Sequence, residues 1–317
     1  MTWVAWRQQR TEMLIAAAIL AVVAALLVPS GLQIISAYHH DGISACLAHQ
    51  DTYSAPQKGF ASNGGCGGAI GSFTQRFEQL GNMVSLLTLV PGLVGALLAA
   101  PFVLDLEQGT YRLVWTQGIT RRRWIAGKLA LAIAAALLVA LALTLLITWW
   151  RAPLVRVNGR MENGVFDLEG IVPLGYALFA LGLALAVGAV WRRAVPALVV
   201  AFASYFAARI FVDTWLRQRL LAPVTKTWRE IGAPPHFLDR AWVIDQYPSD
   251  RLGHALAPGG GKCGPGCVVA SPSGYTHAVF QPASHFWALQ GVETALFGGV
   301  GLALIAFAAW WTRRHVS

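Results

Sequence analysis

Few residues of this 317-residue sequence occur in patterns that support chemistry, and two Gly–Lys pairs come nearest. An ATP-binding loop requires Gly-x-x-x-x-Gly-Lys followed by a Ser or Thr whose hydroxyl holds magnesium. Here Leu129 follows Gly127-Lys128, and Cys263 follows the second pair. The sequence also lacks the zinc-protease His-Glu-x-x-His motif and the Gly-x-Ser-x-Gly nucleophile elbow. We predict that the chain is not an enzyme and binds no metal or cofactor of its own.

The remaining candidates are charged residues inside apolar runs, namely Lys128, Arg209 and Glu293. Lys128 is close enough to the end of its run to extend its ammonium group to the interface. An unpaired charge in lipid is costly, so Arg209 and Glu293 should be paired or hydrated. We predict an Arg209–Glu293 ion pair near the outer edge of the bilayer. Pairing of Arg209 with Asp213, one helical turn further out, and solvation of both charges are the alternatives.

Apolar runs must position these residues, because only 12% of the sequence is charged and its mean hydropathy is +0.53. Soluble domains carry about 25% charged residues. Crossing the hydrocarbon layer takes about 20 apolar residues of helix, which satisfies its own backbone hydrogen bonds. We therefore predict an all-α, polytopic membrane protein that forms a single transmembrane domain over residues 1–317. Its six helices are expected at about residues 13–35, 80–104, 125–150, 171–190, 195–212 and 287–311.

The positions of Lys and Arg predict the orientation, because the cytoplasmic flanks of spans are enriched in them. With both termini in the cytoplasm, the inner segments hold most of the basic excess: Arg7, Arg10, Arg112, Arg121, Arg122, Arg123, Lys128, Arg192, Arg193, Arg313 and Arg314. The outer loops are then residues 36–79, expected to be irregular, residues 151–170, and the large segment 213–286. The net charge of +9 is thus topological and indicates no nucleic-acid partner, although a basic inner rim suits anionic lipid.

The four cysteines fall in the predicted outer loops, Cys46 and Cys66 in the first and Cys263 and Cys267 in the last. An even number of cysteines confined to the oxidising side of a membrane is typical of disulfides. Pairing within each loop is the simplest arrangement, and pairing across the loops is the alternative. Another alternative is a metal site that combines Cys46 with three nearby histidines, His39, His40 and His49.

A short basic segment, residues 105–124, separates the second and third predicted spans. It contains a Gly109-Thr110 turn, Arg112, and the run from Thr120 through Arg121 and Arg122. A polar segment that two spans hold on the cytoplasmic side suits a docking surface better than a catalytic one. We call residues 105–124 the coupling segment.

In these residues the chain resembles the type-2 permease subunits of ATP-binding-cassette exporters, especially the six-span permeases of actinobacteria. The similarity covers essentially the whole length. Its sharpest motif lies in and after the coupling segment, and two further stretches, Gln281–Trp287 and Arg192-Arg193 followed by Pro196, are also similar. The residues that match the motif are Glu107, Gly109-Thr110, Thr120-Arg121 and Gly127-Lys128.

The resemblance implies a multi-pass protein of a bacterial cytoplasmic membrane whose coupling segment forms a helix that inserts into a separate ATPase subunit. ATP and Mg would bind that subunit. The residues assigned to ATPase coupling are Glu107, Gly109, Thr110, Arg112, Thr120, Arg121, Arg122 and Lys128.

A second permease copy or a homologous permease would complete the translocation path. We expect spans two and five to meet across that interface through small and apolar residues: Pro91, Gly92, Gly95, Ala203, Phe206 and Ala207. The substrate class expected is a hydrophobic drug, antibiotic, peptide or lipid, as in multidrug efflux and antibiotic resistance.

The alternatives are a membrane enzyme that acts on lipid-linked substrates and a sensory or immunity component that translocates nothing. A six-span protein whose basic segment only directs topology remains a further possibility.

Overall fold

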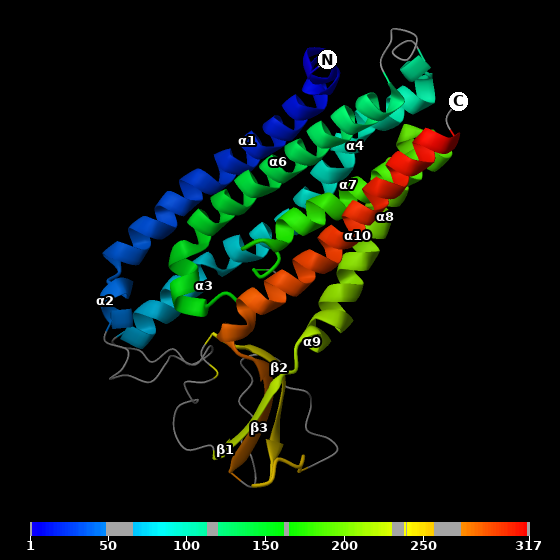
Figure 1. The fold of residues 1–317 in the computed structure, drawn as a ribbon. Coiled ribbons are helices and arrows are strands. Elements are labelled where there is room, and N and C mark those ends of the chain that lie inside the picture. The colour runs from blue at the N-terminus through cyan, green and yellow to red at the C-terminus, as the bar shows by residue number, and fades with distance from the viewer. Residues whose placement is uncertain are drawn as a thin grey trace.

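A bundle of long helices with a small β-sheet at one end makes up the computed structural model (Figure 1). It describes residues 2–48, 66–112, 120–161, 165–229, 238, 240–256 and 274–315, and side chains from residue 10. The start of α1 (Thr2–His40), the end of α4 (Val90–Gln108), the start of α6 (Arg121–Asn158) and the end of α10 (Phe286–His315) lie at the same end, which we call the terminal end (Figure 1). The opposite end, where the strands lie, is the sheet end.

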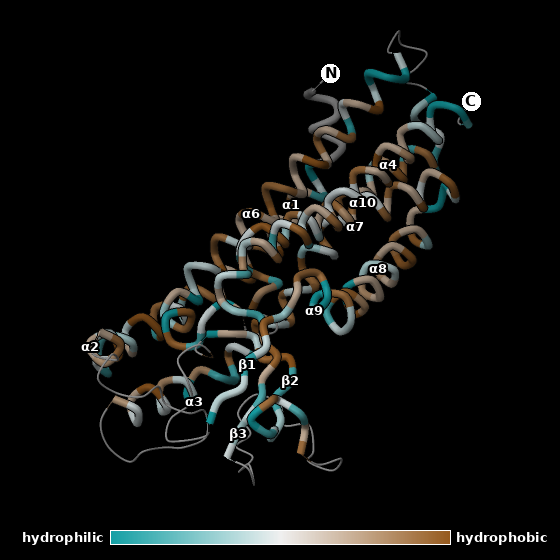
Figure 2. Tube along the Cα trace, turned by 60° about the horizontal axis from the view of Figure 1, so that its bottom comes forward, coloured by the Kyte–Doolittle hydropathy of each residue, from teal (hydrophilic) through white to brown (hydrophobic). Residues whose placement is uncertain are grey.

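Within the residues that the structure describes, six helical segments are long and apolar enough to cross a membrane, in agreement with the six predicted spans. They are Arg10–His40, Cys66–Gln108, Arg121–Asn158, Val172–Trp191, Ala194–Leu220 and Ala283–His315. Hydrophobic residues follow the middle of the helices, and polar residues gather toward the ends and the sheet (Figure 2). Helix α6 (Arg121–Asn158) has 38 residues and is about 57 Å long, so it exceeds a hydrocarbon layer of roughly 30 Å.

The first predicted outer loop, residues 36–79, is helical where the structure describes it, which corrects the expected irregular segment. Helix α1 (Thr2–His40) continues beyond the predicted span and is followed by α2 (Ile43–Ala48) and α3 (Cys66–Ser85). Apolar residues at helical spacing bury one face of α3: Ile70, Phe73, Phe77 and Val84. A disulfide joins Cys46 in α2 to Cys66 at the start of α3, with a Cα–Cα distance of 5.3 Å. Cys46 is therefore not a thiolate metal ligand, whereas Cys263, Cys267 and His49 lie outside the described residues.

The second span changes helix type along its length. A short 3-10 helix, η2 (Leu86–Leu89), separates α3 from α4 (Val90–Gln108). Pro91 lies in the first turn of α4, where a missing backbone N–H has no helical partner to lose. The sequence thus places Pro91 directly after the 3-10 turn, where α4 begins.

Helix α7 (Val172–Trp191) occupies the centre of the bundle, with α10 (Phe286–His315) and α4 as its principal neighbours. Glycines permit these contacts, because a Cβ atom on Gly182 would lie 2.5 Å from the Gly301 carbonyl oxygen. On the α4 side, a Cβ on Gly95 would lie 2.4 Å from the Ala177 carbonyl oxygen. Close backbone approach of this kind is how membrane helices gain packing energy. The α4–α7–α10 group is therefore tightly packed.

The fifth span continues further than predicted. Helix α8 (Ala194–Phe211) leads into a π-helical turn, η3 (Val212–Leu216), and then into α9 (Arg217–Leu220). The predicted span ended at residue 212, but the described helical segment runs to Leu220. This extension brings Arg217 to the edge of the bundle core.

The predicted all-α class is wrong for residues 213–286, the predicted large outer segment, whose described residues contain a three-stranded antiparallel sheet of order β1-β3-β2. Its strands are β1 (Val224–Arg229), β2 (Trp242–Ser249) and β3 (Tyr275–Gln281). Thr276, Ala278 and Phe280 are the buried alternate residues of β3, the period of two that defines a half-buried strand. A 3-10 turn, η5 (Ala283–His285), connects the central strand β3 to α10, so the sheet is attached directly to the sixth span.

Candidate functional sites at the two ends of the bundle

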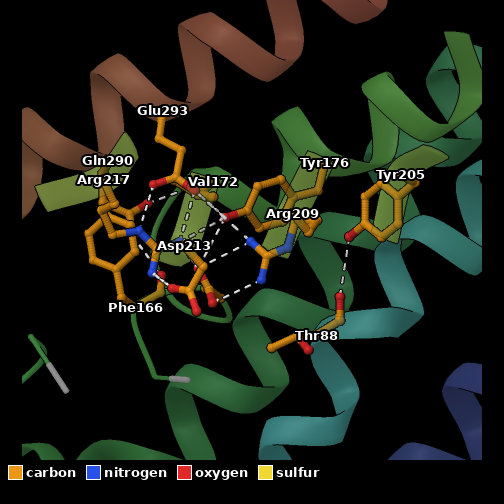
Figure 3. A network of polar contacts seen from close by, with 11 residues as sticks. Thr88, Phe166, Val172, Tyr176, Tyr205, Arg209, Asp213, Arg217, Gln290 and Glu293 are labelled. Atoms are coloured by element: carbon orange, nitrogen blue, oxygen red, sulfur yellow. Dashed lines mark hydrogen bonds and ion pairs between the residues drawn. The ribbon is translucent and has the colours of Figure 1, made fainter. Parts of the chain in front are cut away.

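At the sheet end, the fully buried side chain of Arg217 holds several carboxylates together (Figure 3). Its guanidinium contacts Glu293 with two nitrogens, Nε to Oε2 and Nη2 to Oε1, each at 2.9 Å. It also pairs with Asp167 in the loop before α7 and with Asp213 one helical turn earlier. The planar guanidinium is suited to such multiple contacts because its donors are fixed in a fork. Arg217 therefore joins α9, η3, α10 and the 159–171 loop.

Arg209 enters the same site from α8, and its nearest carboxylate belongs to Asp167. The Nη2–Oδ2 distance is 2.9 Å, whereas Arg209 Nη1 lies 4.0 Å from Glu293 Oε1. The guanidinium also lies 3.9 Å from the centre of the Tyr176 ring, within the range of a cation–π contact. The structure thus brings the predicted partners Arg209 and Glu293 together, but each has a closer partner. The alternative partner Asp213 contacts Arg217 rather than Arg209.

Two polar residues from α7 and α10 complete the arrangement. The Tyr176 hydroxyl lies 2.5 Å from Glu293 Oε1 and 3.0 Å from Asp167 Oδ1, and it donates to one of them. Gln290 Oε1 accepts the N–H groups of Ile171 and Val172, each at 3.0 Å. These N–H groups begin α7 and have no partner within the helix, so α10 caps α7. We refer to Asp167, Tyr176, Arg209, Asp213, Arg217 and Glu293 as the sheet-end cluster.

Asp167 and Glu169, two buried carboxylates of the loop at this end, have pKa values shifted in opposite directions. Burial alone would raise the pKa of Asp167, but Arg217 and Arg209 lower it to about 2. Nearby Glu169 lies 3.6 Å from Arg151 Nε and 3.7 Å from Arg160 Nε, and burial outweighs these cations and raises its pKa. Close charge-assisted hydrogen bonds therefore keep Asp167 ionised, and the looser contacts of Glu169 do not offset its desolvation.

Each formal charge of the sheet-end cluster has an oppositely charged partner. Such an arrangement fixes helices and a loop relative to one another and suits a closed structural joint more than a reaction centre. Sequence reasoning identified Arg209, Glu293 and Asp213 but missed Arg217, Asp167 and Tyr176. A signal was available, because Arg209, Asp213 and Arg217 recur every four residues and so share one helical face.

At the terminal end, the last turn of α4 begins the coupling segment. Asp105 pairs with Lys128 of α6, and the Thr110 hydroxyl donates to Asp105 at 3.0 Å. Lys128 is buried, and its ammonium group lies 5.3 Å from the centre of the Trp124 ring. Lys128 was predicted both to extend to the interface and to contact an ATPase. Its burial corrects both expectations, because the ammonium group is enclosed within this chain and holds α6 to α4.

Glu107 also makes a contact within the chain: its Oε2 accepts the backbone N–H of Ala194 at 2.8 Å. Gly109, in the left-handed conformation with φ of 70°, ends α4, and Tyr111 and Arg112 are again helical. Thr120 is the extended residue before α6. Residues 113–119, the middle of the coupling segment, lie outside the described residues.

The arginines on both sides of that gap have exposed side chains: Arg112, Arg121, Arg122 and Arg123. The arginines of the coupling segment thus reach the surface, whereas Asp105 is partly buried and Glu107, although exposed, contacts the start of α8.

The predicted permease interface is only partly at a surface. Pro91, Gly92 and Gly95 are buried inside this chain, and a Cβ on Gly92 would lie 2.2 Å from the Tyr205 ring. These α4 residues cannot meet a second copy, which corrects the prediction for span two. Their small size serves packing against α7 and α8 instead. The residues predicted on span five are exposed: Ala203, Phe206 and Ala207.

Six apolar spans with a basic polar connection define a polytopic membrane protein. The family model described as ABC-2 membrane transporter related matches residues 17–217, more than half of the sequence. The chain therefore belongs to this family, as its resemblance to type-2 permease subunits predicted. No curated protein and no solved structure matches it. The matched region ends at Arg217, before the β-sheet and α10.

Membership indicates an ABC transporter permease, a class of membrane component that is generally not catalytic itself and that implies an ABC ATPase as partner.

Proposed function

We propose that the chain is the permease subunit of an ABC exporter and that a separate ATPase subunit binds the exposed face of its coupling segment. The observation that carries the proposal is the division of this segment. Arg112, Arg121 and Arg122 are exposed. The flanking turns are attached to the bundle by the Asp105–Lys128 ion pair and by Glu107, which is exposed but accepts the Ala194 N–H. A force applied at the arginines would therefore act on fixed helix ends.

ATP and Mg would bind the partner, because this sequence carries no phosphate-binding loop. In this account the terminal end faces the cytoplasm, in agreement with its basic residues, and the sheet lies outside. Closure of the ATPase subunits would press on the coupling segment and open the path toward the sheet end.

A second permease, identical or homologous, would complete the path along α8. Phe206 is 45% exposed, and Ala203 and Ala207 share its outward face, which allows a close approach of another helix. The exposed apolar surface of the spans suits a substrate that enters from lipid: a hydrophobic drug, an antibiotic, a peptide or a lipid.

The proposal is tested by measuring how tightly each ABC ATPase subunit of the source genome binds the purified permease in nanodiscs. The variant Arg121→Ala/Arg122→Ala should lower the affinity of the cognate ATPase by at least about tenfold, as expected for loss of charge-assisted contacts. The matched control is Arg313→Ala/Arg314→Ala, which removes two exposed arginines at the same end of the bundle. Equal affinities for both variants, or no ATPase that binds the wild type, would contradict the proposal.

A further inference from the structure

The last turn of α4 carries two carboxylates that bind different helices. Asp105 and Glu107 are two residues apart, so their side chains leave the helix roughly 200° apart. Asp105 pairs with Lys128 of α6, and Glu107 accepts the Ala194 N–H at the start of α8. The helix end from which the coupling segment departs is therefore attached on both sides.

The contact of Glu107 meets a need that α8 cannot meet itself. The first N–H groups of a helix have no acceptor within it, and Arg193, the residue before α8, makes no side-chain capping bond to any described residue. A carboxylate at this position also interacts favourably with the positive end of the helix dipole. Glu107 is thus the N-terminal cap of α8, although it belongs to α4.

Packing beneath this contact leaves α4 and the α7–α8 corner little freedom to move separately. A Cβ on Gly188 would lie 2.3 Å from a methyl carbon of Val103, which precedes Glu107 by one helical turn. Val103 also packs in one buried cluster with Ala194 and Ala197 of α8. Because dense contacts transmit displacement, movement of the end of α4 should carry the start of α8 with it.

We propose that Glu107 is a positioning residue that transmits displacement of the coupling segment to α8, and that it does not contact the ATPase. The inference rests on the proposed function, in which the ATPase binds the exposed arginines. It separates two roles within one segment: Arg121 and Arg122 receive the partner, and Glu107 passes the movement on.

The experiment uses the complete permease–ATPase complex in nanodiscs and pulsed electron paramagnetic resonance. Spin labels are attached to keto amino acids introduced by codon expansion, which leaves the cysteines unchanged. One pair joins exposed Arg10 of α1 to exposed Val195 of α8, and a second pair joins Arg10 to exposed Gln108 of α4. In the wild type, ATP with vanadate should change both distances.

In Glu107→Ala, the Arg10–Gln108 distance should still change with ATP and vanadate, whereas the change at Val195 should be lost. ATPase affinity should stay at the wild-type value. Glu107→Gln keeps an oxygen that can accept the Ala194 N–H, so it should restore the change at Val195. Rescue by glutamine distinguishes positioning from a contact that requires negative charge.

The inference is overturned if Glu107→Ala weakens ATPase binding as much as Arg121→Ala/Arg122→Ala does, or if the change at Val195 survives in Glu107→Ala. The inference is also contradicted if Glu107→Gln gives the same result as Glu107→Ala, both in the distance change at Val195 and in ATPase affinity. If the proposed function itself is wrong, the result differs: Arg121→Ala/Arg122→Ala then binds the ATPase as tightly as the wild type does.

Discussion

The two ends of the bundle use charge in opposite ways. At the sheet end, Arg217 is buried and contacts the carboxylates of Asp167, Asp213 and Glu293. At the terminal end, an enclosed ion pair, Lys128–Asp105, holds α6 to α4, and the charges around it include exposed arginines and the exposed Glu107, which accepts the Ala194 N–H. Breaking a buried ion pair is costly because a charge stays behind in low dielectric, whereas exposed pairs contribute little. The sheet end is therefore firmly joined, whereas in the proposed function the terminal end binds the ATPase and moves with it.

Substitution of Arg217 is expected to have the largest effect on stability. Arg217→Ala leaves three carboxylates without their shared partner, and we expect a loss of about 3–5 kcal/mol in the free energy of unfolding. Arg217→Lys should lose less of the free energy of unfolding than Arg217→Ala, because the lysine ammonium group keeps a positive charge at the site and replaces part of the guanidinium contacts. Thermal unfolding of the permease in nanodiscs measures both.

The matched control for Arg217 is Arg219→Ala, which removes an exposed arginine two residues further along α9. Its melting temperature should stay near that of the wild type. Equal melting temperatures for Arg217→Ala and Arg219→Ala would show that the buried contacts add no stability.

A smaller loss of stability is expected on substitution of Arg209, whose nearest charged partner is Asp167. Arg209→Ala should cost about 1.5–3 kcal/mol, the range for a hydrogen bond to a charged group. In double-mutant cycles, coupling with Asp167→Asn should exceed coupling with Glu293→Gln, because the distances are 2.9 and 4.0 Å. Stronger coupling to Glu293 would restore the pairing expected from the sequence.

The smallest effect is expected at Glu169, whose pKa is raised by burial. A carboxyl group with a raised folded-state pKa stabilises the protein at low pH, and this contribution is lost as the pH rises through the folded-state pKa. Asp167 behaves oppositely: its contribution is present above pH about 4 and is lost only as the pH falls toward about 2. Glu169→Gln should therefore unfold near the wild-type temperature at pH 7, whereas Asp167→Asn should unfold well below it. The reverse order would contradict these assignments.

The sequence predicts the membrane spans well because apolar length is a direct physical requirement of the bilayer. It also places Arg209 and Glu293 in one site, because a charge within an apolar run needs compensation. Arg217 escaped notice because the predicted span ends at Val212, and Arg217 lies beyond it in a segment that also carries the charged residues Asp213 and Arg219. Asp167 belongs to a loop, and its contacts depend on how that loop folds over α7.

The sequence predicts where the helices lie better than which residues they pack against. Gly92 and Gly95 form a small-residue pattern that fits a contact between two chains as well as one within a chain. The structure uses both inside the molecule, against Tyr205 and Ala177. The sheet was missed because its strands are separated by long connections, although the alternation in Tyr275–Gln281 was present.

The most direct test of the contrast between the ends measures both in one complex by pulsed electron paramagnetic resonance. One label pair, at Arg10 and Gln108, reports the terminal end, and a second pair at exposed Arg219 and Trp287 reports the two helices that Arg217 joins. We predict that ATP with vanadate changes the first distance and leaves the second unchanged. A second distance that changes while the first stays fixed would contradict the account.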